Sequence, residues 1–388
     1  MLKRNKVVIT SGHRWKYFQW FLLGLYELKE QDDIDFAFNL GLGDRINATI
    51  LASVLSKFKL KIGRDSYNMC GYFLSAQGKK KKFCIDSADS PFLFDEESLI
   101  DCDVYFKMQY PKDICEDYFS LTDDIKIPWQ DHKHVDKSVP LMGYGKHRVI
   151  EHFEKYTHKI KPLMIGPRRL VKKNSFDSLS FKTLQEGYSS YLKDRSLAKS
   201  KRFMCYFGDS KGPVPNEVCI ENVDFDKEAD LLGAYINRIQ HPNEKRAVVA
   251  DIVSKLDLCD ARVINGEKKK GEVIPLDEFC SHISQFQYNM NVSGYRLSIP
   301  NRFIESFLVG TGIVTDKLHV KWYQDFDDEV VELVEMGYLL NDNVNWEDYE
   351  QQLRRLPSVS PKNIIENYEK KWAPIKVAEY IVETLEKA

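Results

Sequence analysis

The residues best suited to chemistry lie together in the second half of the chain, over residues 289–316. Tyr295 and Arg296 directly follow an apolar-leaning run, and Arg302 and Glu305 come shortly after them. Because Arg302 and Glu305 are three residues apart, they lie near each other if this segment is helical. Arginines, hydroxyls and a carboxylate around a helix start that follows a strand are suited to holding a phosphorylated ligand.

Local signals predict the elements that position these residues. Gly294 permits a tight turn, and Pro300 stands where a helix can begin, because its missing N–H costs nothing there. Apolar residues at helical spacing give that helix one buried face; they are Phe303, Ile304, Phe307 and Leu308. Gly310 and Gly312 end the helix, and residues 313–315 predict a short buried strand. The stretch therefore predicts a strand, a polar loop, a helix and a second strand.

Two other loops after predicted strands carry residues of interest. His13 follows the strand at residues 6–10 and is the first choice for a general base, although it could equally be a packed histidine. Gly208 and Lys211 lie in a glycine-containing loop after the strand at residues 201–207, where backbone N–H groups suit a diphosphate. Neither the P-loop spacing nor the G-x-G-x-x-G spacing is present, so an ordinary surface turn is the alternative there.

Other residues compete for the role of base. Asp44 is the second choice, although an aspartate at that position is equally a good helix cap. Asp131 and His132 form a third and weaker option for the base. His319 follows the predicted strand at residues 313–315 and could contact either substrate.

Residues 294–314 resemble the donor-binding segment of GT-B glycosyltransferases, above all in its exostosin-like form. The matching positions are Gly294, Arg302, Glu305 and Gly310. The resemblance implies that Arg302 contacts the nucleotide diphosphate and that Glu305 holds the ribose or the sugar. This chemistry is sound, because a guanidinium can bind phosphate oxygens in pairs and a carboxylate can accept from vicinal hydroxyls. Residues common ahead of the family's motif are absent, so the family's particular sugars are not implied.

The alternation of predicted strands and helices indicates an α/β fold with two tandem Rossmann-like β/α domains. Strands are predicted at residues 6–10, 34–40, 82–86, 102–107, 161–165, 201–207, 246–250, 261–264, 286–292, 313–315, 319–323 and 329–334. Helices are predicted at 15–30, 45–57, 146–158, 180–192, 226–238, 252–258, 276–284, 346–353, 361–370 and 374–387, besides the one after Pro300. Residues 61–82 suggest a hairpin or an excursion from the pattern, and residues 110–144 are irregular.

We expect three parts: residues 1–190 as an acceptor domain, 191–372 as a nucleotide-sugar donor domain, and 373–388 as a helix that returns to the first domain. Two such domains facing a central cleft are the GT-B arrangement that the resemblance implies. Ligands of open β/α sheets lie at the carboxyl ends of the strands, so the three loops named above should face this cleft.

Composition limits the class of protein. The 388 residues are too many for one ordinary core, and 43% hydrophobic with 12% aromatic residues fits a packed globular protein. The net charge of −2 gives no general drive toward nucleic acid or an anionic membrane. The lysine runs at residues 79–82 and 268–270 are local, and solvated loops explain them. The eight cysteines show no C-x-x-C pair or zinc-finger spacing, which favours reduced thiols in a cytoplasmic protein. No segment predicts a signal peptide or a transmembrane helix.

The sequence therefore predicts a glycosyltransferase that moves a sugar from a nucleotide-diphosphate sugar to a glycan or other hydroxyl acceptor, in surface or capsular polysaccharide or glycan synthesis. Its donor-binding residues would be Gly208, Lys211, Tyr295, Arg296, Ser298, Arg302 and Glu305. We expect no cofactor and no metal: Asp101 and Asp103 form an Asp-x-Asp triplet, but it precedes a predicted strand instead of following one. A nucleotide-sugar epimerase and a non-catalytic carbohydrate-binding scaffold are the alternatives.

Overall fold

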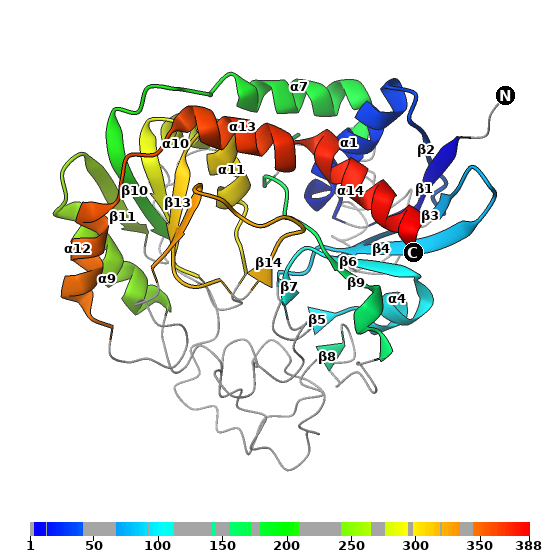
Figure 1. Cartoon of the computed structure of the whole chain (residues 1–388), viewed down its shortest axis with the longest axis horizontal. Helices are drawn as coiled ribbons and strands as arrows, with labels where there is room; N and C mark the ends of the chain where they lie inside the picture. The colour runs from blue at the N-terminus through cyan, green and yellow to red at the C-terminus, as the bar shows by residue number, and fades with distance from the viewer. Residues whose placement is uncertain are drawn as a thin grey trace, which may run out of the picture.

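The chain folds into two lobes, each built on one β-sheet, as a computed structural model shows (Figure 1). The structure describes residues 4–12, 14–41, 67–89, 91, 93–111, 142–143, 155–168, 170–171, 179–208, 242–264, 276–293, 298–318, 320–333 and 344–388. Several elements predicted from the sequence lie outside these ranges: the helices at 45–57 and 226–238, the helix at 146–158 except its last residues, and most of the irregular segment 110–144.

The sheet of the first lobe has the order β2-β1-β3-β4-β6-β9. Its strands are β1 Asn5–Gly12, β2 Ile34–Phe38, β3 Asn68–Leu74, β4 Lys80–Asp86, β6 Val104–Lys107 and β9 Ile160–Pro162. All neighbours are parallel except β3, which pairs antiparallel with both β1 and β4. The predicted hairpin is thus confirmed, and its first strand fills the position between β1 and β4. Without β3, the remaining strands would have a doubly wound parallel order.

The sheet of the second lobe is parallel throughout, in the order β11-β10-β12-β13-β15. Its strands are β10 Lys201–Gly208, β11 Cys259–Ile264, β12 Phe286–Met290, β13 Gly312–Thr315 and β15 Val330–Glu332. The first strand along the chain, β10, lies between the second and the third, which is the flavodoxin-like order 2-1-3-4-5. The order of the strands reverses between β10 and β12, and ligands of such sheets bind at the carboxyl ends of these two strands.

Helices cover both sheets. They are α1 Gln19–Glu30, α4 Glu96–Asp101, α7 Phe181–Leu192, α9 Pro242–Ser254, α10 Leu276–Ile283, α11 Arg302–Leu308, α12 Trp346–Arg355, α13 Pro361–Lys371 and α14 Pro374–Lys387. Local sequence explains several starts: Ser180, Asn345 and Ser360 cap α7, α12 and α13 with their side chains. None of the described helices is both long and apolar enough to span a membrane.

One sequence prediction is wrong. Residues 246–250 do not form a strand, because α9 runs through them from Pro242 to Ser254 and also includes the first three residues of the predicted helix at 252–258. The run Ala-Val-Val-Ala is short and apolar, and such runs do not distinguish strand from helix by periodicity. Val249, Ile252, Val253 and Leu256 are buried at helical spacing, and tertiary packing therefore decides the structure.

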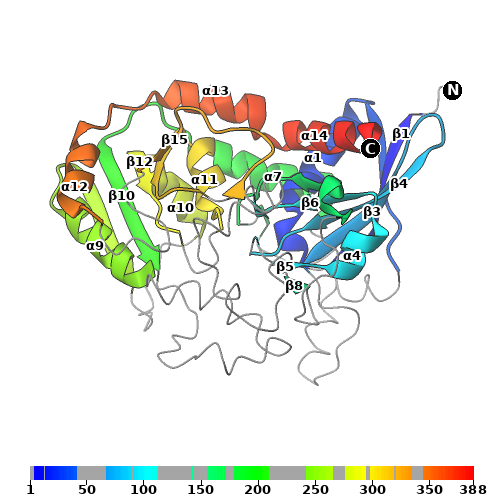
Figure 2. The ribbon, with the colours of Figure 1, turned by 60° about the horizontal axis from the view of Figure 1, so that its bottom comes forward.

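The last helix returns to the first lobe, as predicted. α14 packs along α1, and Gly24 of α1 comes so close that an added Cβ would lie 2.0 Å from the Pro374 carbonyl oxygen. Trp20 of α1 donates its ring N–H to the Trp372 carbonyl oxygen at 3.1 Å. Figure 2 shows α13 and α14 following each other along one side of both lobes. One continuous apolar core, from Val7 in β1 to Leu385 in α14, joins the lobes.

Candidate ligand site at the second sheet

Arg246 bridges β10 and β12, the two strands between which the strand order of the second sheet reverses. Its guanidinium donates to the Gly208 carbonyl oxygen at 2.8 Å, at the end of β10, and to the Val292 carbonyl oxygen at 3.1 Å, just beyond β12. Arg246 lies in the early part of α9, and this end of the helix is therefore at the carboxyl edge of the sheet. A cation thus lies at the place where ligands of this strand order bind.

Arg302 also bridges β10 and β12, and it reaches them from α11. It is the first residue of α11, and its Nη1 donates to the Tyr206 carbonyl oxygen at 3.3 Å and to the Met290 carbonyl oxygen at 3.2 Å. Its Nε and Nη2 make no hydrogen bond to any residue that the structure describes. A guanidinium has five N–H donors, so Arg302 keeps donors for a ligand after it has bound the two carbonyl groups.

The charges around Arg302 are predominantly positive. Burial, and next the charges of Arg246 and Arg168, lower the pKa of Arg302 to about 10, while the nearby Glu305 carboxylate acts in the opposite direction. Arg302 therefore stays protonated at neutral pH, and three guanidinium groups influence one another at the sheet edge. An anion bound here would offset their mutual repulsion. We call Arg168, Arg246 and Arg302 the arginine cluster.

Glu305 is fully buried beside the cluster. Its Oε1 accepts the backbone N–H of Arg168 at 3.0 Å, so this carboxylate holds a loop of the first lobe against α11. Its Oε2 is buried without a hydrogen-bond partner among the described residues. A buried carboxylate oxygen without a donor is costly, and a ligand hydroxyl is one group that would satisfy it.

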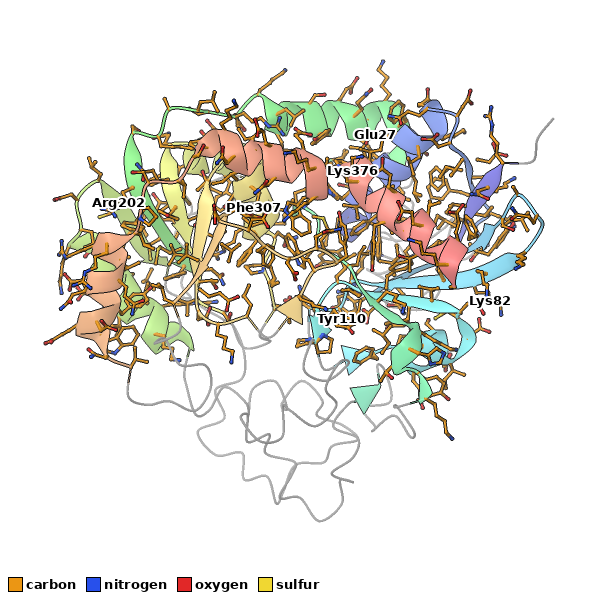
Figure 3. All side chains as sticks on the ribbon, viewed as in Figure 1. Glu27, Lys82, Tyr110, Arg202, Phe307 and Lys376 are labelled. Atoms are coloured by element: carbon orange, nitrogen blue, oxygen red, sulfur yellow. The ribbon has the colours of Figure 1, made fainter. Side chains whose placement is uncertain are left out.

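Backbone contacts between the lobes fix the start of α11. Gln109, just after β6, accepts the N–H of Ile299 and donates to its carbonyl oxygen, both at 3.0 Å. Asn301 donates to the Gly166 carbonyl oxygen at 2.6 Å. Nearby, β7 (Tyr110–Pro111) pairs antiparallel with β14 (Val320–Lys321). Tyr110 of this pair is labelled in Figure 3. The segment that enters α11 is therefore held by the first lobe on several sides.

The loop after β12 is anchored separately. Asp316, just beyond β13, accepts the backbone N–H of Ser293 at 3.0 Å and its hydroxyl at 3.0 Å, and Thr315 also donates to it. Burial raises the pKa of Asp316, while these hydrogen bonds and the charge of Lys245 act in the opposite direction. This anchor fixes Ser293, just beyond the end of β12.

The structure brings together three of the residues predicted from sequence and describes a fourth, Ser298, in the preceding loop. Gly208, Arg302 and Glu305 lie at or beside the edge where β10 and β12 end, and Ser298 lies in the loop that enters α11. The other predicted residues lie outside the described part of the chain: His13, Asp44, Lys211, Tyr295 and Arg296, together with the weaker options Asp131, His132 and His319. Their roles stay predictions.

Sequence reasoning missed Arg246 and Arg168. Arg246 begins the strand predicted at residues 246–250, and that prediction concealed its place on a helix at the sheet edge. Pro242, a residue that is favoured in the first turn of a helix, was the signal that could have corrected this. Arg168 comes from the other lobe, and only the tertiary fold brings it to α11.

A second polar cluster lies at the carboxyl edge of the first sheet. Asp86 ends β4 and Lys107 ends β6, both fully buried, and their side chains are 2.7 Å apart. The Asp86 carboxylate also accepts the Tyr105 hydroxyl at 2.7 Å and the backbone N–H of Ala88 at 2.7 Å. Charged residues at two adjacent strand ends were the signal in the sequence. Because both charges are buried and paired with each other, we interpret the pair as an anchor for the strand ends.

The Asp-x-Asp triplet has a local structural role. Asp101 accepts from the Lys82 ammonium at 2.7 Å, and Asp103 accepts the backbone N–H of Lys82 at 2.7 Å. Both aspartates thus hold the adjacent strand β4 at the amino end of β6. In the ranges that the structure describes, no group of three His, Cys, Asp or Glu residues is placed to hold a metal ion.

No protein-family model and no curated protein matches the sequence. Among solved structures, the chain is similar to the pneumococcal O-GlcNAc transferase GtfA, solved in complex with UDP and GlcNAc. The two are 14% identical with a TM-score of 0.17, and the match covers 50% of this chain and 36% of that chain. The match is too distant to support an argument about function, and the fold assignment therefore rests on the strand orders given above.

Proposed function

We propose that the protein is a glycosyltransferase that uses a nucleotide-diphosphate sugar as donor. The observation that supports this most is the arginine cluster at the reversal point of the second sheet. Arg246 and Arg302 reach this edge from two helices, and Arg168 reaches it from the other lobe. A diphosphate is the anion that fits several guanidinium groups best, because each group can bind two phosphate oxygens.

The same cluster would help the chemical step. When the sugar leaves, negative charge develops on the nucleotide diphosphate, and fixed cations in a desolvated site stabilise it without reorganising. Two carbonyl groups hold the Nη1 of Arg302, which would keep this cation in place during the step. Under this proposal, the residue that accepts the proton of the acceptor hydroxyl is His13 or Asp44.

Glu305 would contribute to recognition of the donor. Its Oε2 is buried on α11 without a hydrogen-bond partner among the described residues. A ribose or sugar hydroxyl would supply the missing donor. The acceptor would bind from the first lobe, whose loops at Gln109 and Gly166 contact the start of α11.

Incubation with a panel of nucleotide sugars, with and without glycan acceptors, tests the proposal. A transferase releases free nucleotide mainly when an acceptor is present, whereas an epimerase changes the sugar without releasing the nucleotide. A carbohydrate-binding scaffold would bind glycans but neither bind nor turn over any nucleotide sugar. Binding of none of the nucleotide sugars by folded protein would refute the proposal.

A further inference from the structure

Two cysteines face each other across the hairpin of the first sheet. Cys70 of β3 and Cys84 of β4 are direct partners in the antiparallel register. At one end of this hairpin the N–H of Ser87 bonds to the Tyr67 carbonyl oxygen, and at the other the N–H of Ser75 bonds to the Lys79 carbonyl oxygen. Hydrogen-bonded pairs alternate with non-hydrogen-bonded ones, so counting from either end makes the cysteines a non-hydrogen-bonded pair.

This register sets the separation of the Cα atoms of the two cysteines. The Cα atoms of a non-hydrogen-bonded pair are about 4.5 Å apart, with their side chains on the same face of the sheet. Disulfides span Cα separations of about 4.4–6.8 Å. A bond between Cys70 and Cys84 therefore fits at the short end of the allowed range, without any rearrangement of the strands.

A cavity gives small molecules access to the pair. It has a volume of about 390 Å³ and lies between the face of β1, β3 and β4 and helix α4. Both cysteines line it, together with Tyr72, Lys80, Lys82, Ser98 and Cys102. Lys82 lies on the side of the first lobe away from the second sheet (Figure 3), so this cavity is separate from the arginine cluster. Cavities from about 300 Å³ upward accept small organic ligands.

The two thiols have different environments. Cys70 is partly exposed, and its Sγ is 3.9 Å from the Ser98 hydroxyl, whereas Cys84 is buried. Hydrogen bonding from the Cys84 thiol, and to a smaller extent from Ser11 and Ser98, lowers the pKa of Cys70. Burial raises the pKa of Cys84 well above its usual range. Cys70 is thus the better nucleophile of the two, because the thiolate is the reactive form.

We propose that Cys70 and Cys84 form a redox-active pair that reacts with a low-molecular-weight disulfide entering this cavity. The Cys70 thiolate attacks one sulfur of the small disulfide, and a thiolate leaves as a mixed disulfide forms on Cys70. The Cys84 thiol then loses its proton to solvent and attacks the Cys70 sulfur, which releases the second small thiolate. The two protein thiols are oxidised to a cross-strand disulfide, and the small disulfide is reduced to two thiols.

To test this, the folded, full-length chain is treated with oxidised glutathione. The chain is then denatured, its remaining thiols are alkylated, and the state of each cysteine is mapped by mass spectrometry. We expect a peptide pair joined through Cys70 and Cys84, with near-complete loss of alkylation at both. The variant Cys102→Ser is the matched control, because Cys102 lines the same cavity on another element and should not affect the bond. The variant Cys84→Ser should stop at glutathione on Cys70.

Two results would overturn the proposal. One is full alkylation of both cysteines in the wild-type chain after oxidation, which requires no variant to fold. The other is a bond from Cys70 to Cys102, or glutathione retained on Cys70 while Cys84 stays alkylated. The test needs no nucleotide and no turnover, and its outcome is therefore independent of the proposed transferase activity.

Discussion

At the scale of single residues, the proposed site consists of cations that the backbone holds in place. Arg246 and Arg302 each use part of a guanidinium to join β10 to β12 and thereby become rigid. Rigid donors lose little conformational entropy when they bind an anion, which favours tight binding. The same residues therefore stabilise the fold and form the proposed site.

Gly208 offers a test of where the ligand lies. Its backbone is outside the left-handed region, and an added Cβ would have no neighbour within 4 Å. We expect Gly208→Ala and Gly208→Leu to keep the melting temperature of the wild type. The leucine side chain would occupy the space beside the diphosphate and weaken nucleotide binding at least about tenfold, or about 1.4 kcal/mol. Unchanged affinity in the folded leucine variant, measured by calorimetry, would place the ligand elsewhere.

The sequence predicted residues of this site where one segment carried the signal. Gly294 to Gly310 contain Arg302 and Glu305, and local spacing was sufficient to place them at a helix start. Arg168 was not predictable, because its position depends on packing between the lobes. The direct role of Glu305 in holding the Arg168 backbone was hidden for the same reason.

At the scale of elements, buried charges fix the strand ends on which the interlobe loops depend. The Asp86–Lys107 pair joins β4 to β6, and two residues later Gln109 binds the backbone of Ile299 ahead of α11. The predicted order of strands and helices was largely correct, because alternation and capping are local signals. The helix at 242–254 was missed because burial on a helical face, not local propensity, decides its structure.

The variant Asp86→Asn tests this anchor. It leaves the Lys107 ammonium in a buried position without its carboxylate, which we expect to lower the free energy of unfolding by about 3–5 kcal/mol. Denaturation in urea measures this loss. The variant Asp101→Asn is the control, because it breaks an exposed pair with Lys82 and should cost about 1 kcal/mol or less. Equal effects of the two variants would show that the buried pair is no special anchor.

At the scale of the whole molecule, the two lobes are joined by a shared core and by the return of α14 to α1. Glu27 of α1 lies at this junction and is labelled in Figure 3. Burial, and next the charge of Glu369, raise the pKa of Glu27 to about 7 from an ordinary value of 4.5, although the Ile375 N–H acts against this. The Glu27 carboxyl group therefore favours its neutral form in the folded protein.

This raised pKa makes the stability of the molecule depend on pH. Protonated Glu27 stabilises the fold fully below about pH 4.5, and this contribution is lost as the pH rises toward 7. The variant Glu27→Gln should therefore be more stable than the wild type at pH 8, by about 1–2 kcal/mol after allowance for solvent screening, but not at pH 4.5. Melting curves of both proteins across this range measure the difference. A gain that is equal at both pH values would contradict this assignment.

Calorimetric titration of nucleoside diphosphates into the wild type, Arg302→Ala and Arg202→Ala tests directly whether the arginine cluster binds the donor. Arg202 lies at the amino end of β10 in the same sheet (Figure 3) and donates to the backbone carbonyl oxygens of Arg354 and Leu356. It is therefore a matched control for the stability that is lost with an arginine. We predict that Arg302→Ala weakens binding about tenfold or more, since charged hydrogen bonds contribute about 1.5–3 kcal/mol, while Arg202→Ala binds like the wild type. Absence of binding to the folded wild type, or equal affinity in all three proteins, would contradict the account.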